Sequence, residues 1–203
     1  MRQVKDLLFD RGIDIRHETV RFWWNRYGPM FAAEIRKRRV HYRLYSNWRW
    51  HLDEVFVRIN GERDYHWCAI YHEGEVLEVF ATKRWDRRAA LKFLKRTMKR
   101  YGQPSSIVTD RLRSYGAAMK VIGNLERKEC GRWLNNRVEN SHQPFRRRKG
   151  AMARFRDIKT QQKFASAHVS IHNQFNQDRH LNRQDIFKQS RATALAEWCQ
   201  LAA

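Results

Sequence analysis

The chain has 203 residues, and its 42 Lys and Arg residues outnumber 21 Asp and Glu residues, which gives a formal net charge of +21. A hydrophobic fraction of 42% excludes a disordered tail, and no apolar run approaches the roughly 20 residues that cross a bilayer. The N-terminus lacks the pattern of a signal peptide, and three widely spaced cysteines indicate neither a disulfide framework nor a zinc ribbon. We therefore expect a reduced cytoplasmic protein with no membrane association, built around one ordinary domain.

The excess of positive charge predicts a polyanionic partner. Lys and Arg are spread along the chain with eight Trp residues among them, and they do not form one amphipathic helix. Contact with phosphate groups would release condensed counterions, so nucleic acid is the favoured partner. An anionic membrane surface and a merely solvated excess of charge are the alternatives.

The N-terminal segment predicts two short helices. Residues 2–11 have apolar side chains at helical spacing and Gly12 can end that helix, while a second helix over 17–27 would stop at Gly28-Pro29. Two helices joined by a glycine turn match the end of a helix-turn-helix, with an ordinary helical hairpin as the alternative. In the first case DNA would contact the outward side chains Arg16, Arg21 and Arg26, with Val20, Trp23 and Trp24 packed inward. Residues 34–49 predict a basic linker or arm that could lie on phosphate, with a solvated, charged helix end as the alternative.

From Trp50 the pattern changes to strands. Runs rich in β-forming residues over 50–59, 64–72 and 75–81 are separated by Asn60-Gly61 and Glu73-Gly74, and Asn-Gly is a strong hairpin signal. An amphipathic helix over 86–101, a buried strand over 105–109, a helix near 114–122, an extended piece near 126–133 and helices from about 136 and 158 follow. This order predicts an α/β, RNase H-like fold with a mixed sheet and helices on both faces.

Three acidic residues lie where such a sheet would place its chemistry. Asp53 is inside the first strand, where Asp is disfavoured, and period-2 alternation puts Glu54 on the other face, so we select Asp53. Asp110 ends the buried strand, and Glu139 lies early in a helix. Such a trio could hold the two divalent ions, ~3.5–4 Å apart, that serve phosphoryl transfer. Taken singly, each acid has a structural alternative: an arginine pair, a turn and a helix cap, respectively.

Three segments carry a resemblance to a known family. HLDEVFVRINGER (51–63), IVTDRLRSYGAA (107–118) and LNNRVENSHQPFRRR (134–148) resemble the signature blocks of bacterial insertion-sequence transposases of family six, which have a DDE catalytic domain. The resemblance extends over nearly the whole chain, to about residue 198. It implies an integrase-like catalytic domain whose triad is Asp53, Asp110 and Glu139, with Arg146 as the basic residue seven positions after the glutamate. Arg146 would share a helix face with Glu139, although Pro144 interrupts that helix.

The resemblance also implies a cofactor and partners. We expect Mg²⁺, with Mn²⁺ as an alternative ion, and binding to double-stranded DNA at terminal inverted repeats and at the target. We further expect replicative, cointegrate-forming transposition by a homo-oligomer on DNA, in the bacterial cytoplasm at the nucleoid. The basic run Arg146, Arg147 and Arg148 would contact the DNA backbone.

The chain is predicted to divide into three parts: a partial helix-turn-helix with a basic linker (1–46), an RNase H-like DDE catalytic domain (47–176) and a C-terminal helical tail (177–203). It begins with the second helix of the family's helix-turn-helix region, which predicts an N-terminally truncated copy. Only 28 residues separate Asp110 from Glu139, a shorter interval than is usual for the family.

Two functions follow from these features. The first is a DNA transposase that cleaves and joins strands at the ends of its element, and the convergent acids in so basic a chain favour it. The second is a catalytically inactive relic that occupies the repeats or inhibits an intact transposase. His168 and His172, four residues apart, are expected to pack with the aromatic side chains on their helix face rather than to bind a metal.

Overall fold

A computed structural model describes residues 2–43, 49–59, 61–71, 74–110, 112–130, 155, 157–175 and 183–202. The helices in these ranges are α1 (Arg2–Phe9), α2 (His17–Arg43), α3 (Arg87–Tyr101), α4 (Arg113–Ile122), the 3₁₀ turn η1 (Leu125–Arg127), α7 (Ile158–Phe175) and α8 (Gln184–Ala202). The strands are β1 (Arg49–Ile59), β2 (Glu62–Tyr71), β3 (Val76–Thr82), β4 (Ser106–Thr109) and β5 (Lys128–Cys130). The order of elements in the described parts is the predicted one.

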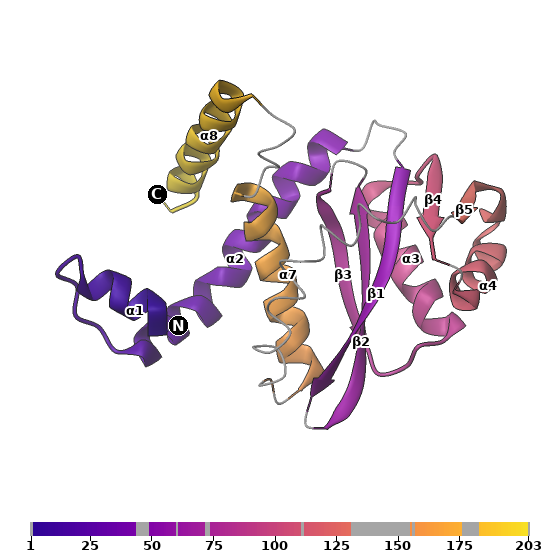
Figure 1. Ribbon diagram of the computed structural model, residues 1–203, viewed down its shortest axis with the longest axis horizontal. Coiled ribbons are helices and arrows are strands. Elements are labelled where there is room, and N and C mark those ends of the chain that lie inside the picture. Colours follow the sequence, from indigo (N-terminus) through magenta and orange to yellow (C-terminus); the bar gives the residue numbers. More distant parts are fainter. Residues whose placement is uncertain are drawn as a thin grey trace.

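The strands form one mixed sheet in the order β3-β2-β1-β4-β5. The three strands of the meander pair antiparallel, whereas β4 lies parallel to β1 and β5 lies parallel to β4. Helices α3 and α4 lie on one side of this sheet, and α7 with α2 lies on the other (Figure 1). The structure therefore confirms the predicted α/β fold with a mixed sheet between two helical layers.

The two faces of the sheet bury different side chains. On the α3–α4 face, Trp50, Leu52 and Ile107 are almost fully buried against a cluster that includes Phe93 and Tyr115. On the α7 face, buried side chains from β2, β3 and α7 form a smaller cluster: Cys68, Ile70, Val76, Val79, Ala165 and Val169. Because alternate strand residues point to opposite faces, even-numbered residues of β1 face α3 and α4, and odd-numbered residues face α7.

Both predicted hairpins are present. β1 ends at Ile59 and β2 begins at Glu62, and Gly61 between them has a φ of 82°. Gly74, between β2 and β3, has a φ of 93°. Such positive φ values are readily adopted only by glycine, so the two glycines permit the tight turns that set the pairing of the meander.

Helix α2 differs from the prediction. It does not end at Gly28-Pro29 but continues to Arg43, so most of the segment expected to be a linker or arm is helical. Pro29 lacks the N–H group that would donate to the carbonyl of Asn25, and Lys163 Nζ of α7 donates to that carbonyl instead, at 3.0 Å. A contact from 138 residues further along the chain therefore replaces the hydrogen bond that proline removes.

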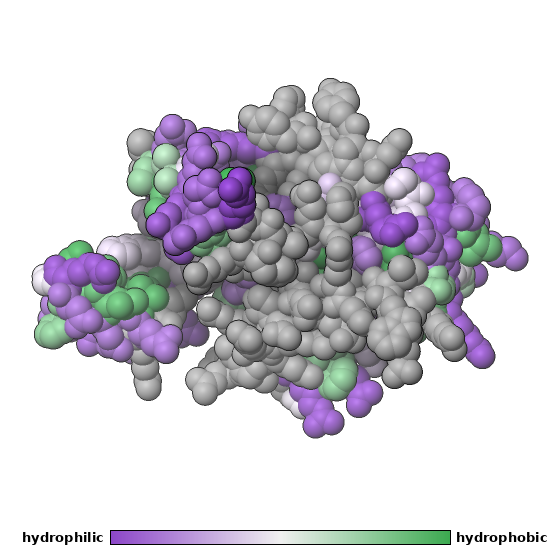
Figure 2. Space-filling view, turned by 45° about the horizontal axis from the view of Figure 1, so that its top comes forward, coloured by the Kyte–Doolittle hydropathy of each residue, from purple (hydrophilic) through white to green (hydrophobic). Residues whose placement is uncertain are grey.

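Helix α2 packs along α7 through part of its length. Val20, Ala32 and Ile35 are buried, and the Trp24 ring lies 5.9 Å from the Phe164 ring of α7. The expectation that Trp23 faces inward is wrong, since its side chain is 43% exposed. Hydrophobic residues also lie on the surface of α1 (Figure 2), where Val4, Leu7 and Phe9 are exposed.

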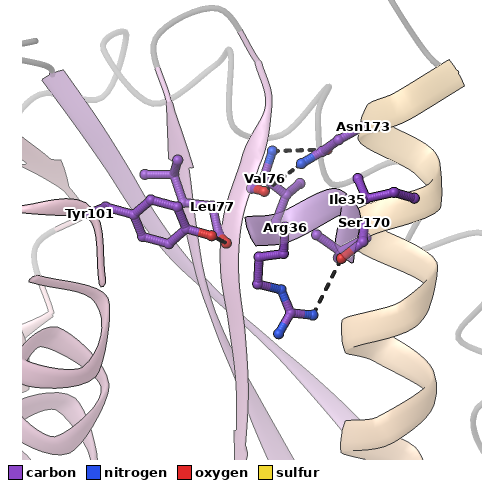
Figure 3. A pocket seen from close by; sticks show the side chains of 8 residues that line it. Ile35, Arg36, Val76, Leu77, Tyr101, Ser170 and Asn173 are labelled. Atoms are coloured by element: carbon purple, nitrogen blue, oxygen red, sulfur yellow. Dashed lines mark hydrogen bonds between the residues drawn. The ribbon is translucent and has the colours of Figure 1, made fainter. Parts of the chain in front are cut away.

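Helix α7 also pairs with the edge strand β3. Asn173 accepts from the backbone N–H of Val76 at 3.2 Å and donates to its carbonyl at 2.6 Å, as Figure 3 shows. Gln162, nearer the start of α7, makes the same kind of contact. It accepts from the Ala81 N–H at 2.6 Å and donates to the Val79 carbonyl at 2.7 Å. These two amides satisfy backbone groups that an exposed edge would otherwise present to another strand.

The same junction ties α2 to α7 and α3 to the sheet. Arg36 of α2 donates to the Ser170 hydroxyl at 3.3 Å, and Tyr101 of α3 donates to the Leu77 carbonyl at 2.7 Å (Figure 3). Helix α8 contacts both α2 and α7, because its Trp198 ring lies 5.2 Å from Phe31 and 5.5 Å from Phe175. None of the helices in the described residues is long and apolar enough to pass through a membrane.

Candidate active site

Asp53 and Asp110 come from neighbouring parallel strands. In the β1–β4 pairing, Trp50 lies opposite Ile107 and His51 lies opposite Val108. Continuing this register by two residues sets Asp53 beside Asp110, which directly follows β4. The structure thus brings together the two strand-borne acids selected from the sequence, at the carboxyl end of β4.

Glu54 also belongs to this acidic group, and sequence reasoning set it aside. Alternation does put Glu54 on the α3–α4 face, yet its carboxyl interacts electrostatically with both Asp110 and Asp53. Asp110 lies past the last paired residue of β4, so it is not confined to one face of the sheet. The acidic pair Asp53-Glu54 was the only sequence signal for a third nearby carboxylate.

The environment of Glu54 disfavours another negative charge. Burial above all, and then the charges of Asp110 and Asp53, raise the pKa of Glu54 from 4.5 to about 8. The Asp110 carboxyl, as a polar neighbour, also acts in this direction, whereas the nearby Tyr115 hydroxyl lowers the pKa. Among the described residues, the groups that shift this pKa are two acids and a phenol, so this part of the structure concentrates negative charge.

Tyr115 of α4 lies beneath the acids. Its side chain is fully buried, and burial, followed by the charges of Glu54, Asp53 and Asp110, raises its pKa well above 10. Tyr115 Oη and Glu54 Oε2 are close polar neighbours, although neither atom has a partner of good hydrogen-bond geometry among the described residues. The phenol is therefore a neutral hydroxyl next to the carboxylates.

The Asp110 side chain shapes the backbone that follows it. Its Oδ1 accepts from the Leu112 N–H at 3.0 Å, two residues on, as in an Asx turn that leads into α4. The Thr109 hydroxyl donates to the Asp110 carbonyl at 2.7 Å. Asp110 remains exposed, so the turn role noted as its structural alternative coexists with access from solvent.

Several predicted site residues lie outside the described residues: Glu139, Arg146, Arg147 and Arg148. Within the residues that the structure does describe, no three His, Cys, Asp or Glu side chains are grouped closely enough to hold a metal ion. His168 and His172 stack with ring centres 5.9 Å apart, and the Phe164 ring lies 5.8 Å from His168.

The predicted DNA contacts near the N-terminus lie on or beside the first turns of α2. Arg16, Arg21 and Arg26 are all exposed, as expected for an outward face. The Arg26 guanidinium lies 5.9 Å from the Phe22 ring centre and 5.7 Å from that of Tyr27.

Comparison with known proteins agrees with this fold. Residues 47–178 match the DDE domain family. The chain is 33% identical, over 164 residues, to the transposase for the insertion sequence-like element IS431mec of Staphylococcus aureus, covering 78% of this chain and 70% of that protein. The same identity and coverage apply to the transposase for insertion sequence element IS257 in transposon Tn4003 of Staphylococcus aureus.

Among solved structures, the HTLV-2 integrase catalytic core domain in complex with magnesium, in its dimeric form, superimposes with a TM-score of 0.51. The two sequences are 14% identical, and the match covers 66% of this chain and 91% of the integrase chain. This likeness concerns the fold alone.

The fold and the match to the DDE domain family define an RNase H-like polynucleotidyl transferase class. Within that class, the chain belongs to the DDE-domain transposases of insertion sequences, in the group that contains the IS431mec and IS257 enzymes.

Proposed function

We propose that Asp53, Asp110 and Glu139 form the catalytic triad of this insertion-sequence transposase, and that the enzyme cleaves DNA at terminal inverted repeats and joins the ends to target DNA. The observation that supports this most strongly is the β1–β4 register, which sets Asp53 beside Asp110 at the end of a parallel strand. Open α/β sheets bind ligands at such carboxyl ends.

The acidic site suits hard divalent cations. Burial and the two neighbouring acids shift the pKa of Glu54 to about 8, so this site accommodates positive charge and disfavours further negative charge. Oxygen-rich sites of this kind suit Mg²⁺ or Mn²⁺, which Asp53, Asp110 and Glu139 would hold. When bound, a pair of such ions activates the attacking oxygen and stabilises the leaving oxygen of a phosphodiester.

The reaction has two displacements at phosphorus. In the first, a water oxygen forms a bond to the phosphorus at the element end, the bond to the 3′ oxygen breaks, and that oxygen leaves as a 3′-OH. In the second, the oxygen of this 3′-OH forms a bond to the phosphorus of a target phosphodiester, the bond to the target's own 3′ oxygen breaks, and that oxygen leaves as a 3′-OH. Arg146 binds the substrate phosphate beside the triad, and no covalent bond to the protein is formed.

Binding of DNA ends is assigned to the basic residues outside the acidic site. Arg16, just before α2, and Arg21 and Arg26 on α2 are exposed and suit the phosphates of the terminal repeats. Arg147 and Arg148 follow Arg146 along the chain. Joining two DNA segments requires two active sites, so the enzyme acts as a homo-oligomer on DNA. Its products are cointegrates, and it works at the nucleoid in the bacterial cytoplasm.

The test is strand cleavage on a supercoiled plasmid that carries the matched inverted repeats. The wild-type chain is expected to nick the repeat ends with Mg²⁺ and to leave them intact in EDTA. Asp53→Asn and Glu139→Gln should each lower the rate by at least a hundredfold, whereas Asp185→Asn, an exposed acid on α8, should not change it. If wild-type binds the repeats but never cleaves them, the chain is the inactive relic.

A further inference from the structure

Four cationic side chains form a stripe along the outer surface of α3. Arg88, Lys92, Lys95 and Lys99 are all exposed, and their spacing of four, three and four residues puts them on one side of the helix. At 1.5 Å per residue the stripe is about 16 Å long. We name this set the α3 stripe.

The helix under the α3 stripe is firmly attached. Its opposite side buries Ala89, Ala90, Phe93, Leu94 and Thr97 against the sheet. Asp86 caps the first turn by accepting from the Ala89 N–H at 2.8 Å, and Gly102, with a φ of 78°, ends the helix. The four cations are therefore held on a rigid support.

The cations of α3 fall into two groups. Arg96 and Arg100 form ion pairs with Glu78 of β3, whose side chain is only 2% exposed. The members of the α3 stripe, by contrast, form no ion pair within the described part of the chain, and Lys92 merely lies 5.5 Å from the Phe80 ring centre. Within the described residues, ion pairs therefore neutralise Arg96 and Arg100 and leave the α3 stripe as a positive surface.

The surface continues past the start of the helix. Arg84 and Arg87 are exposed, and so is Trp85, at 47%. The Trp85 ring stacks on Tyr65, with centres 5.6 Å apart and planes 6° from parallel. A rigid aromatic pair and two more cations therefore extend the α3 stripe toward its N-terminal end.

We propose that the α3 stripe, with Arg84 and Arg87, binds the backbone of a DNA duplex without reading its sequence. Over about 16 Å a duplex presents roughly ten phosphate charges, which complement this row of cations. Three of its four members are lysines, compact charges on flexible stems that suit phosphates better than the fixed patterns of base edges.

The position of the α3 stripe indicates which duplex this is. Helix α3 packs on the face of the sheet that buries Trp50 and Leu52, whereas Asp53 belongs to the opposite set of β1 residues. A stretch of duplex on α3 is therefore separate from the phosphodiester that reacts at the acids. On the proposed function, which this step rests on, this stretch is a flank of the target DNA, because the target needs little sequence readout, unlike the terminal repeats.

The experiment compares two charge-matched variants. The first carries Arg88→Gln, Lys92→Gln, Lys95→Gln and Lys99→Gln, and the control carries four equivalent exposed changes on α4, α8 and the residue before it: Lys120→Gln, Arg183→Gln, Lys188→Gln and Arg191→Gln. Binding to a random duplex is measured by fluorescence anisotropy between roughly 50 and 300 mM salt. Circular dichroism and thermal melting establish that both variants are folded.

The salt slope gives a quantitative outcome. Losing four phosphate contacts should reduce the slope of log K against log salt by about 3 to 4 in the stripe variant and by less than about 1 in the control. The charge-keeping set Arg88→Lys, Lys92→Arg, Lys95→Arg and Lys99→Arg should retain the wild-type slope. Equal losses in stripe and control variants would overturn the proposal, as would competition by polyglutamate as effective as that by DNA of equal charge. Should the quadruple variant misfold, Lys95→Gln with Lys99→Gln is used, with an expected loss of about 2.

The target assignment has its own readout. The stripe variant should cleave the element ends at the wild-type rate and show at least a tenfold loss in joining a pre-cleaved end to random target DNA. Normal joining combined with a reduced salt slope would confirm the surface and refute its assignment to target DNA. Loss of cleavage in Asp53→Asn tests the catalytic proposal separately, so failure of one proposal is distinguishable from failure of the other.

Discussion

Replacing Glu54 by glutamine tests the electrostatics of the acidic site. The pKa of this group is 4.5 when the chain is unfolded and about 8 when it is folded. A carboxyl whose pKa is raised on folding contributes its full share of stability when the pH is below its pKa in the unfolded chain. That contribution is lost as the pH rises through about 8, its pKa in the folded chain. Between the two values each pH unit costs about 1.4 kcal/mol, so the wild-type chain forfeits up to about 3 kcal/mol at pH 7. Glutamine does not ionise and avoids this cost.

The assay is urea unfolding in EDTA at several pH values. Glu54→Gln should exceed the wild-type stability by less than about 1 kcal/mol at pH 5, by up to about 3 kcal/mol at pH 7 and by more at pH 9. Glu126→Gln, at an acid that is 68% exposed on η1, is the matched control and should show no such trend. A stability difference that does not change with pH would refute the argument that burial, together with Asp110 and Asp53, raises the pKa of the Glu54 carboxyl.

Three further predictions concern the contacts that hold the fold together. Asn173→Ala leaves the Val76 N–H and carbonyl without the amide partner and should lower the free energy of unfolding by about 1–3 kcal/mol, measured with urea, and increase aggregation on heating. Asp86→Ala removes the cap of α3 and should cost about 1 kcal/mol in the same assay, with Asp86→Asn retaining most of the stability. Pro29→Ala supplies the missing helical N–H and should raise the melting temperature without changing the helical content measured by circular dichroism, and a loss of stability would contradict our account of Lys163.

Local signals were sufficient for much of the fold. The Asn60-Gly61 and Glu73-Gly74 pairs located both hairpins, and the helical spacing of apolar residues located α3 within one residue of its observed start. These signals work because turn geometry and amphipathic spacing act over a few residues. The end of α2 was mispredicted, since its continuation past Pro29 depends on a contact from α7 that no local pattern reveals.

The candidate site shows the same division. The alternation within β1 selected Asp53, and the end of a buried run selected Asp110, because both depend on local register. The proximity of Glu54 to Asp110 depends on how β4 lies against β1 and on where β4 ends, which are tertiary features. The alternation of side chains along a strand predicts which face of the sheet each one lies on. It does not predict how close a side chain comes to a residue that follows the end of a neighbouring strand. The roles of Glu139 and Arg146 stay predictions.

The central claim is that Asp110 holds a divalent ion during strand cleavage, and a change of ligand atom tests it most directly. Asp110→Cys replaces a carboxylate oxygen by sulfur, which Mg²⁺ accepts poorly and Mn²⁺ accepts better. We predict that this variant fails to cleave a plasmid bearing the inverted repeats with Mg²⁺ and recovers measurable cleavage with Mn²⁺, while wild-type is active with either ion. Cleavage by Asp110→Cys with Mg²⁺ at the wild-type rate would contradict the claim and reduce Asp110 to the residue that turns the chain into α4.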